Sequence, residues 1–305
     1  MSLTGAQVSV VIPVLNAERW LPTLLPALLK QRPNPPAEIL LLDSKSTDRT
    51  CELAATFPGV RVIPVESFSH GGTRNMGARE ARQPVVVLMT QDACPADEGW
   101  LAALLAPLED SGVAAVYSRQ VPHADASPME KYFLATHFPE QALVREAKES
   151  GDGLGFLEVF FSNVSAALRR DLLLKFPFDE ALIMSEDQQV SRDLIQAGYR
   201  IAYASKSVVV HSHNYTLAGC FRRYFDSVYS LTCIFRQHGM GTSAAMGLSY
   251  LWKEAWFVAS RHPLWLPYYA LYTAAKTLGT VLGHFADQMP RSWARACSLH
   301  SYHWR

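Results

Sequence analysis

The chain has 305 residues, with 28 Lys/Arg balanced by 28 Asp/Glu, so its formal net charge is zero. Apolar residues make up 49% and charged residues 18% of the sequence, which is the composition of a folded globular protein and excludes a disordered one. A chain of this length can bury a full core as one or two domains.

Four apolar runs with strand character alternate with helical patterns in the first half of the chain. Repeated β-α units of this size predict an α/β fold, a Rossmann-like and mostly parallel sheet with flanking helices. We expect strands over residues 8–14, 38–42, 60–65 and 84–89, and helices over 18–30, 46–55, 73–81 and 100–109. Ligand sites in such sheets gather beyond the C-terminal strand ends, where Asn16, Asp43 and Asp92 fall.

The second strand ends at Asp43 and is followed by Ser and Thr residues that precede a helix. One of Ser46 and Asp48 is expected to cap that helix. Asp43 comes before the turn, so its carboxylate is free to accept a hydrogen bond from a base or a ribose.

Paired glycines, Gly71 and Gly72, precede the third helix. They can let the backbone approach a ligand, and a helix N-terminus attracts phosphate, to which Arg74 would add charge. The alternative is a capped helix after a tight turn. The segment is neither GxxxxGK[ST] nor a GxGxxG after the first strand, so a P-loop is excluded and a dinucleotide fold is unsupported.

Three further positions carry acidic or imidazole groups. Asp92 follows the fourth strand, and a single carboxylate suits Mg²⁺ or Mn²⁺ when phosphates supply other oxygens. Glu186 and Asp187 open a helical run, and His211 and His213 follow the strand-like residues 208–210. Alternating strand side chains would place both histidines on one face. A carboxylate that takes a proton and imidazoles that hold a metal indicate polar group-transfer chemistry.

From residue 215 onward the chain is predicted to be helical and amphipathic, which divides it into domains at 1–214 and 215–305. Residues 211–305 hold nine Lys/Arg and three Asp/Glu, a net charge of +6, and five of the seven tryptophans. A basic, aromatic segment indicates an acidic or amphipathic partner such as a membrane face. Residues 264–283 come nearest to a membrane span, but they include Pro267 and Lys276, so a buried or interfacial helix is expected.

Five scattered cysteines without a CxxC pair indicate reduced thiols in a cytosolic protein. A strand begins almost at once, without the basic and apolar regions of a signal peptide, so none is expected. The expected location is cytoplasmic, or peripheral on the inner face of the membrane. Residues 151–155 (GDGLG) are expected to form a flexible loop that orders over substrate.

Together these segments resemble the inverting nucleotide-sugar glycosyltransferases of family 2, which have the so-called A fold. The matching segments are VSVVIPVLNA, LLLDSKSTDRT, GTRNMGA, TQDA, SEDQ and HSH, and they span residues 8–215 in the family's order. The sequences of the segments FSHGGTRNMGA and TQDA are similar to those of rhamnosyltransferases that use dTDP-L-rhamnose. The C-terminal helices, with LPYYALYTAAKTLG and LHSYHW, are similar to that subgroup too, which adds a C-terminal helical extension to the expected fold.

The resemblance implies roles for individual residues. Asp187 would be the catalytic base, with Glu186 second for that role, and Asp92 would hold a metal, Mg²⁺ or Mn²⁺. The family's DxD motif has Thr90 at its first position here, so metal affinity would be weak unless His211 or His213 supplies the missing ligand. On the acceptor side the implied contacts are Asn163 and Trp100, although Trp100 would equally suit packing. The implied nucleotide contacts are Pro13, Val14, Asn16, Asp43, Ser46, Arg74 and Gln91.

The implied activity is transfer of L-rhamnose from dTDP-L-rhamnose, with inversion, to a hydroxyl of a glycan or lipid-linked acceptor. Two alternatives are a family 2 transferase that uses a UDP-sugar and a non-catalytic glycan-binding protein on the same fold. The C-terminal helices are expected to contact the acceptor, a membrane surface or a second subunit in a homo-oligomer. No nucleic-acid partner is expected.

Overall fold

A computed structural model describes residues 3–147, 154–235 and 243–304. Their contacts divide the chain into two compact units. The first comprises residues 1–121, 138–181 and 186–211, and the second comprises 122–137, 182–185 and 212–305. The second unit thus contains two short segments in addition to the C-terminal helices. The sequence had predicted a single boundary after residue 214. Residues 151–153 of the predicted loop lie outside the described residues.

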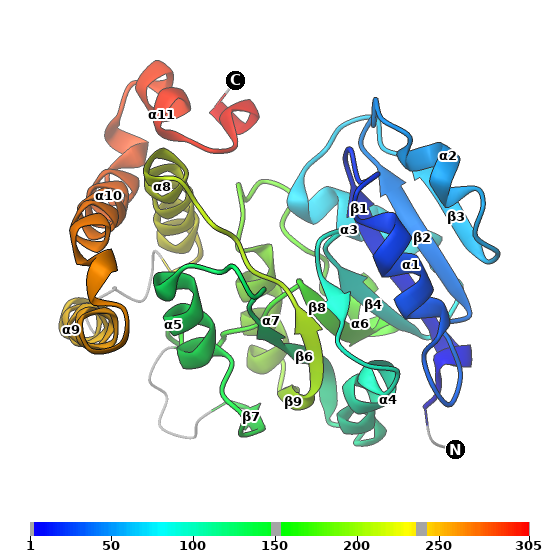
Figure 1. The fold of residues 1–305 in the computed structure, drawn as a ribbon. Helices are drawn as coiled ribbons and strands as arrows, with labels where there is room; N and C mark the ends of the chain where they lie inside the picture. Colours follow the sequence, from blue (N-terminus) through cyan, green and yellow to red (C-terminus); the bar gives the residue numbers. More distant parts are fainter. Residues whose placement is uncertain (1–2, 148–153, 236–242, 305) are drawn as a thin grey trace. The chain divides into compact units, whose positions relative to one another are not determined.

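The first unit is built on a nine-stranded mixed sheet (Figure 1). The strand order is β3-β2-β1-β4-β8-β6-β9-β5, and β7 pairs with β9. Its strands are β1 (Val8–Val14), β2 (Glu38–Asp43), β3 (Val60–Pro64), β4 (Val85–Met89), β5 (Cys94–Pro95), β6 (Val113–Val121), β7 (Leu143–Arg145), β8 (Ser165–Arg169) and β9 (Arg200–Val210). The first four strands are parallel to one another, as predicted, while β5, β7 and β8 pair with their neighbours antiparallel.

Helices cover both faces of this sheet (Figure 1). The first unit contains α1 (Leu21–Leu29), α2 (Thr50–Ala54), α3 (His70–Glu80), α4 (Trp100–Leu105), α6 (Arg170–Lys175), α7 (Glu186–Gln196) and the 3₁₀ helices η1 (Gly5–Gln7) and η2 (Ala106–Glu109). The leucines of α1 and α4 pack against alternate residues of β1, β2 and β4, such as Val10 and Leu41. The opposite face of β1 and β2 meets α3, where a Cβ on Gly77 would lie 2.3 Å from the Val11 side chain. The central strands are therefore buried on both sides, which explains their continuous apolar sequences.

Two of the predicted helices differ from the structure for identifiable reasons. The helix expected over 46–55 begins only at Thr50, because residues 46–48 are hydrogen-bonded to the loop after β1. The helix expected from Thr73 begins at His70, because the Ser69 side chain caps it by accepting a hydrogen bond from the Gly72 amide at 3.0 Å.

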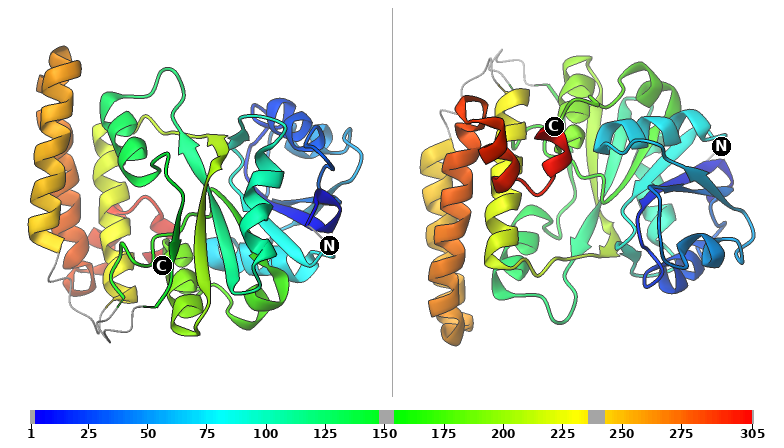
Figure 2. Two further views of the ribbon diagram at one scale, coloured as in Figure 1. Left: turned by 90° about the horizontal axis from the view of Figure 1, so that it is seen from below. Right: turned by 90° about the horizontal axis from the view of Figure 1, so that it is seen from above.

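The second unit is helical, as predicted. It contains α5 (Pro128–His137), α8 (Leu217–Ile234), α9 (Ser243–Arg261), α10 (Leu266–His284), α11 (Arg291–Cys297) and the 3₁₀ helices η3 (Pro263–Trp265), η4 (Ala286–Gln288) and η5 (Ser301–Trp304). Helix α10 runs alongside α8 (Figure 2), where Gly279 and Gly283 lie against the backbone of Phe221 and Phe225. Along the described part of the chain, no helix is long and apolar enough to cross a membrane.

Candidate active site

The loops that follow β1 and β2 are joined by hydrogen bonds among residues predicted to bind a nucleotide. The Asn16 backbone amide donates to Ser46 Oγ at 2.9 Å, and the side-chain oxygen Oδ1 of Asn16 accepts from the Thr47 backbone amide at 2.9 Å. Both carboxylate oxygens of Asp43 accept from the Ser46 amide, at 3.3 and 3.2 Å. Asn16 and Lys45 have φ angles of 50° and 67°, in the left-handed region that tight polar turns use. The structure thus brings these residues together at one sheet edge.

Gln91, in the turn after β4, extends this cluster. Its Oε1 accepts from the Leu15 amide at 2.8 Å, and its Nε2 donates to the Leu15 carbonyl at 3.2 Å. The half-buried Pro13 and the buried Val14 end β1 beside it. Three strand ends of the first unit therefore meet in one polar edge, and backbone groups and amides of this kind can recognise a base and a ribose.

The acidic pair, Glu186 and Asp187, occupies the first turn of α7. Residues of the segment before β8 donate hydrogen bonds to both carboxylates. Asp187 Oδ2 accepts from the Asn163 amide at 3.2 Å, and Asp187 Oδ1 accepts from the Gln188 amide at 2.9 Å. The neighbouring Glu186 is buried and forms an ion pair with Arg74 at 3.0 Å. The Asn163 side chain also donates to Glu186 Oε1 at 3.2 Å.

The two carboxyl groups have opposite proton affinities. Burial and the negative charge of Glu186 raise the pKa of Asp187 to about 7, outweighing the amides that favour its ionised form. Burial would also raise the pKa of Glu186, but the positive charge of Arg74, with His70, brings it below its ordinary value. Glu186 therefore stays ionised, while Asp187 is a carboxyl that can gain or lose a proton near neutral pH.

Arg74 and the paired glycines have surroundings that differ from the prediction. Arg74 is 6% exposed, and its guanidinium is paired with Glu186. This position suits a residue that stabilises the acidic pair better than one that contacts a diphosphate, the role that was predicted. A Cβ on Gly71 would lie 2.7 Å from the Asp179 carbonyl oxygen. These glycines therefore admit a neighbouring segment of the chain, and the capped-helix alternative describes them better than a phosphate loop.

Both residues predicted on the acceptor side are buried. Trp100 has no exposed surface, and its indole N–H donates to Ser118 at 3.2 Å and to Ser165 at 3.1 Å. Asn163 is 2% exposed and bonds to the acidic pair. Neither offers surface to an acceptor in this structure. Trp100 therefore packs, and Asn163 holds the carboxylates.

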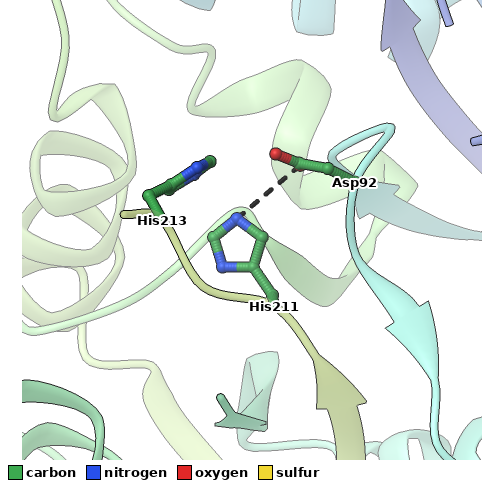
Figure 3. A group of neighbouring side chains, drawn as sticks. All are labelled: Asp92, His211 and His213. Atoms are coloured by element: carbon green, nitrogen blue, oxygen red, sulfur yellow. Dashed lines mark ion pairs between the residues drawn. The ribbon is translucent and has the colours of Figure 1, made fainter. Parts of the chain in front are cut away.

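The predicted metal ligands lie together after β4 and β9 (Figure 3). Asp92, His211 and His213 each offer one ligand atom, and these atoms lie within 4.8 Å of one another. His211 Nε2 is 3.6 Å from Asp92 Oδ1. Because β9 ends at Val210, both histidines lie in the loop after the strand. This loop, and not the alternation of strand side chains, brings them to one carboxylate. One carboxylate and two imidazoles fit a divalent ion such as Mn²⁺.

Two residues of this region were missed from sequence. Gln120, on β6, is buried, and its side chain lies between His211 Nδ1, 2.9 Å away, and Ser162 Oγ, at 2.9 Å. Ser162 directly precedes Asn163 and is buried as well. The available signal was weak, because Gln120 is the last of three consecutive polar residues, Ser118, Arg119 and Gln120, near the end of β6. A buried amide needs hydrogen-bond partners.

Comparison with solved structures identifies the fold. A mannosyltransferase from Pyrobaculum calidifontis, PcManGT, in complex with GDP-Man and Mn²⁺, has a TM-score of 0.62 at 20% identity, over 92% of this chain and 86% of that one. S. aureus TarS 1–349 in complex with UDP-GlcNAc has a TM-score of 0.56 at 17% identity, over 96% and 84% of the two chains. The fold is thus the glycosyltransferase A fold, with a C-terminal helical extension, as predicted.

Sequence comparison defines the family. Residues 9–175 match the model of Glycosyl transferase family 2. The O-antigen chain rhamnosyltransferase RfbN of Salmonella typhimurium is 34% identical over 98% of this chain and 96% of its own. WbaN, the O-antigen chain rhamnosyltransferase of Salmonella anatum, is 35% identical over 97% and 95%. This chain belongs to glycosyl transferase family 2, which confirms the prediction of a glycosyltransferase.

Proposed function

We propose that this chain transfers L-rhamnose from dTDP-L-rhamnose to a hydroxyl group of a glycan acceptor. Two observations support the proposal. Two relatives that align over nearly the whole chain carry the name O-antigen chain rhamnosyltransferase. The chemical part of the proposal depends on Asp187 in the first unit. Burial and the charge of Glu186 raise the pKa of this carboxyl to about 7, and two backbone amides donate hydrogen bonds to it.

The polar edge formed by the loops after β1, β2 and β4 is the proposed nucleotide site. Asp43 and Asn16 are oriented there by hydrogen bonds to the Ser46 and Thr47 amides. Pre-ordered groups of this kind bind a ligand without the entropic cost of ordering them first.

Asp92, His211 and His213 are the proposed ligands of a divalent ion. Imidazole nitrogens suit Mn²⁺ better than Mg²⁺, which prefers oxygen ligands and its own water, so Mn²⁺ is the proposed ion. When bound, the ion would neutralise charge on the diphosphate oxygens of the donor.

In the proposed reaction, Asp187 takes the proton from the acceptor hydroxyl. The acceptor oxygen forms a bond to the anomeric carbon, and the bond from that carbon to the diphosphate oxygen breaks. The diphosphate leaves with the electron pair, and configuration inverts because attack and departure occur on opposite faces. Asn163 and Gln188 hold the Asp187 carboxylate, whereas Arg74 keeps Glu186 ionised and already paired. Asp187 is therefore preferred to Glu186 as the base.

The proposed acceptor is a growing glycan on a lipid carrier, with the helical second unit in peripheral contact with the membrane. Exposed tryptophans support this placement: Trp252 and Trp256 of α9 are 74% and 68% exposed. Tryptophan rings favour the interface between lipid headgroups and water. A homo-oligomer is the other arrangement that would cover them.

A donor panel tests the substrate. Purified enzyme, Mn²⁺ and a lipid-linked acceptor are incubated with dTDP-L-rhamnose, UDP-glucose, UDP-GlcNAc or GDP-mannose, and release of the nucleoside diphosphate is measured. We expect the highest kcat/KM with dTDP-L-rhamnose. A preference for a UDP-sugar would overturn the donor but keep the transferase, and no turnover of any donor would favour a glycan-binding protein.

A further inference from the structure

The buried amide of Gln120 lies between the proposed metal site and the segment that holds Asp187. Gln120 is 5% exposed on β6. Its Oε1 is 2.9 Å from His211 Nδ1, and its Nε2 donates to Ser162 Oγ at 2.9 Å. A side-chain amide has a donor end and an acceptor end, so its orientation sets what its neighbours must do.

This orientation determines where His211 carries its proton. With the Gln120 carbonyl oxygen facing the ring, Nδ1 must be the N–H, since an oxygen without hydrogens cannot donate. In the neutral imidazole the lone pair is then on Nε2, the atom that lies 3.6 Å from Asp92 Oδ1. A metal ligand needs that lone pair, and ligating histidines commonly donate their other N–H to a fixed acceptor.

The opposite orientation would give a different site. If the amide were turned over, its N–H would face Nδ1 and the imidazole proton would move to Nε2. That proton would point toward Asp92 across 3.6 Å, which is longer than an N–H···O hydrogen bond. It would also occupy the lone pair that a metal requires. The orientation seen in the structure is the one that serves metal binding.

The other end of Gln120 reaches toward the catalytic carboxylates. Ser162, which accepts from Gln120, is followed by Asn163, whose backbone amide donates to Asp187 at 3.2 Å and whose side chain donates to Glu186 at 3.2 Å. One strand residue therefore contacts both the histidine and the segment that fixes the acidic pair. A side chain that only filled space would need neither contact.

We propose that Gln120 is a positioning residue that fixes the tautomer of His211, so that Nε2 faces Asp92 as a metal ligand. The proposal deepens the metal part of the proposed function and rests on it for the metal affinity. The tautomer itself is a property of the metal-free protein, so it can be judged even if the enzyme uses no metal.

The decisive measurement is the tautomer of His211 in the full-length, metal-free protein. Long-range ¹⁵N–¹H correlation spectra of ¹⁵N-histidine-labelled protein distinguish Nδ1–H from Nε2–H, and a His211→Gln variant identifies the signal. We expect the Nδ1–H form in the wild type and its loss in Gln120→Leu. The Nε2–H form in the wild type, or an unchanged tautomer in Gln120→Leu, would overturn the proposal.

Metal affinity and two further variants separate positioning from a general effect on folding. Gln120→Leu should weaken Mn²⁺ binding, followed by electron paramagnetic resonance, by about 10- to 100-fold. Gln120→Glu keeps an acceptor oxygen and should retain both the tautomer and the affinity. Gln31→Leu removes another buried amide, which bonds to the Leu101 amide and the Asp97 carbonyl, and should leave both readouts unchanged. Equal losses in Gln31→Leu and Gln120→Leu would mean that only packing is involved.

Discussion

Asp187 and Glu186 are adjacent in sequence but differ in surroundings, and this difference predicts what their amides would do. Asp187→Asn should keep donor binding and lower kcat by about 10²- to 10⁴-fold, the usual contribution of a positioned proton acceptor. Single-turnover kinetics and dTDP binding by calorimetry separate the two effects. If the variant keeps more than about half of wild-type turnover, Asp187 does not act as a base of that strength.

Glu186→Gln is the matched comparison, because it changes the neighbouring carboxyl in the same way. It removes the partner of a buried guanidinium that is 3.0 Å away. Breaking a buried ion pair on one side costs about 3–5 kcal/mol of folding free energy. We therefore expect Glu186→Gln to lower the denaturant midpoint, and Asp187→Asn to leave it near the wild-type value. The reverse pattern would exchange the two roles.

The pH dependence of turnover follows from the same pair. A base must be ionised to accept a proton, and burial with the charge of Glu186 raises the pKa of Asp187 to about 7. Below that pH the carboxyl is protonated, so kcat/KM should fall by about tenfold per pH unit on the acid side. The rate of Asp187→Asn should lack this acid limb. An acid limb that persists in the variant would belong to another group.

Removal of the metal is predicted to act on the donor. Asp92→Ala, or chelation of the wild type with EDTA, should raise the KM for the nucleotide sugar, because a divalent ion shared with a diphosphate contributes to its binding. Asp97→Ala is the control, since this side chain accepts from the Gly99 amide and is not part of the cluster of Asp92, His211 and His213. Full activity in chelated buffer would rule out a role for an ion at Asp92 and the histidines.

At the scale of single residues, sequence reasoning succeeded where the chain is locally ordered. Asp43 is the last residue of β2 and Asn16 lies two residues after β1, so their place at the sheet edge follows from the strand pattern. It did not foresee the burial of Arg74 or the contact of Gln120 with His211, because the partners Glu186 and His211 lie over 90 positions away in the chain. Only the folded sheet brings such residues together.

At the scale of elements, the four parallel strands were predictable because each is a mainly apolar run, interrupted in β3 by Arg61. The antiparallel pairing of β8 with β4 and β6 was not predictable, because an apolar run does not indicate whether a strand is parallel or antiparallel to its neighbours. Helix ends depended on side chains: Ser69 caps α3, whereas residues 46–48 bond to another loop and leave α2 short. Element type thus followed from periodicity, while pairing and exact ends followed from tertiary contacts.

The packing of α10 against α8 gives an element-scale prediction. A Cβ on Gly279 would lie 2.3 Å from the Phe221 carbonyl oxygen, so Gly279→Ala must push the helices apart. We expect a loss of about 1–3 kcal/mol in unfolding free energy, as for other overpacked sites. Gly247→Ala, on α9, meets nothing within 4 Å and should be neutral or stabilising. Equal behaviour of the two variants in urea denaturation would contradict this packing.

At the scale of the whole molecule, charge and exposed apolar surface coincide in the second unit. Trp252 and Trp256 of α9 are exposed, as are Leu271, Leu278 and Val281 of α10 and Phe285 directly after it. We call these six residues the exposed apolar face. Lys276, counted among the basic residues from sequence, is instead buried against Glu254 at 3.2 Å. The basic groups available to a surface are those that remain exposed, such as Lys253 and Arg261.

Binding to a membrane requires both the exposed apolar face and the exposed basic residues near it in the sequence. The protein should sediment with vesicles that contain phosphatidylglycerol, and binding should fall with salt, because exposed charges are screened over about 8 Å at physiological ionic strength. Lys253→Gln with Arg261→Gln should weaken binding by about 2 kcal/mol, about 30-fold, at roughly 1 kcal/mol for each basic residue near the surface. Trp252→Ser with Trp256→Ser should weaken it even on neutral vesicles.

The control for charge is Arg79→Gln with Arg82→Gln, which neutralises two exposed arginines of the first unit. If this pair weakens binding as much as Lys253→Gln with Arg261→Gln, the attraction depends on total charge and not on the exposed apolar face. Light scattering after size exclusion tests the other way to cover that face. A dimer that Trp252→Ser with Trp256→Ser dissociates, in a protein that stays in the supernatant with every lipid, would make the face a subunit interface, and the acceptor would then need no membrane.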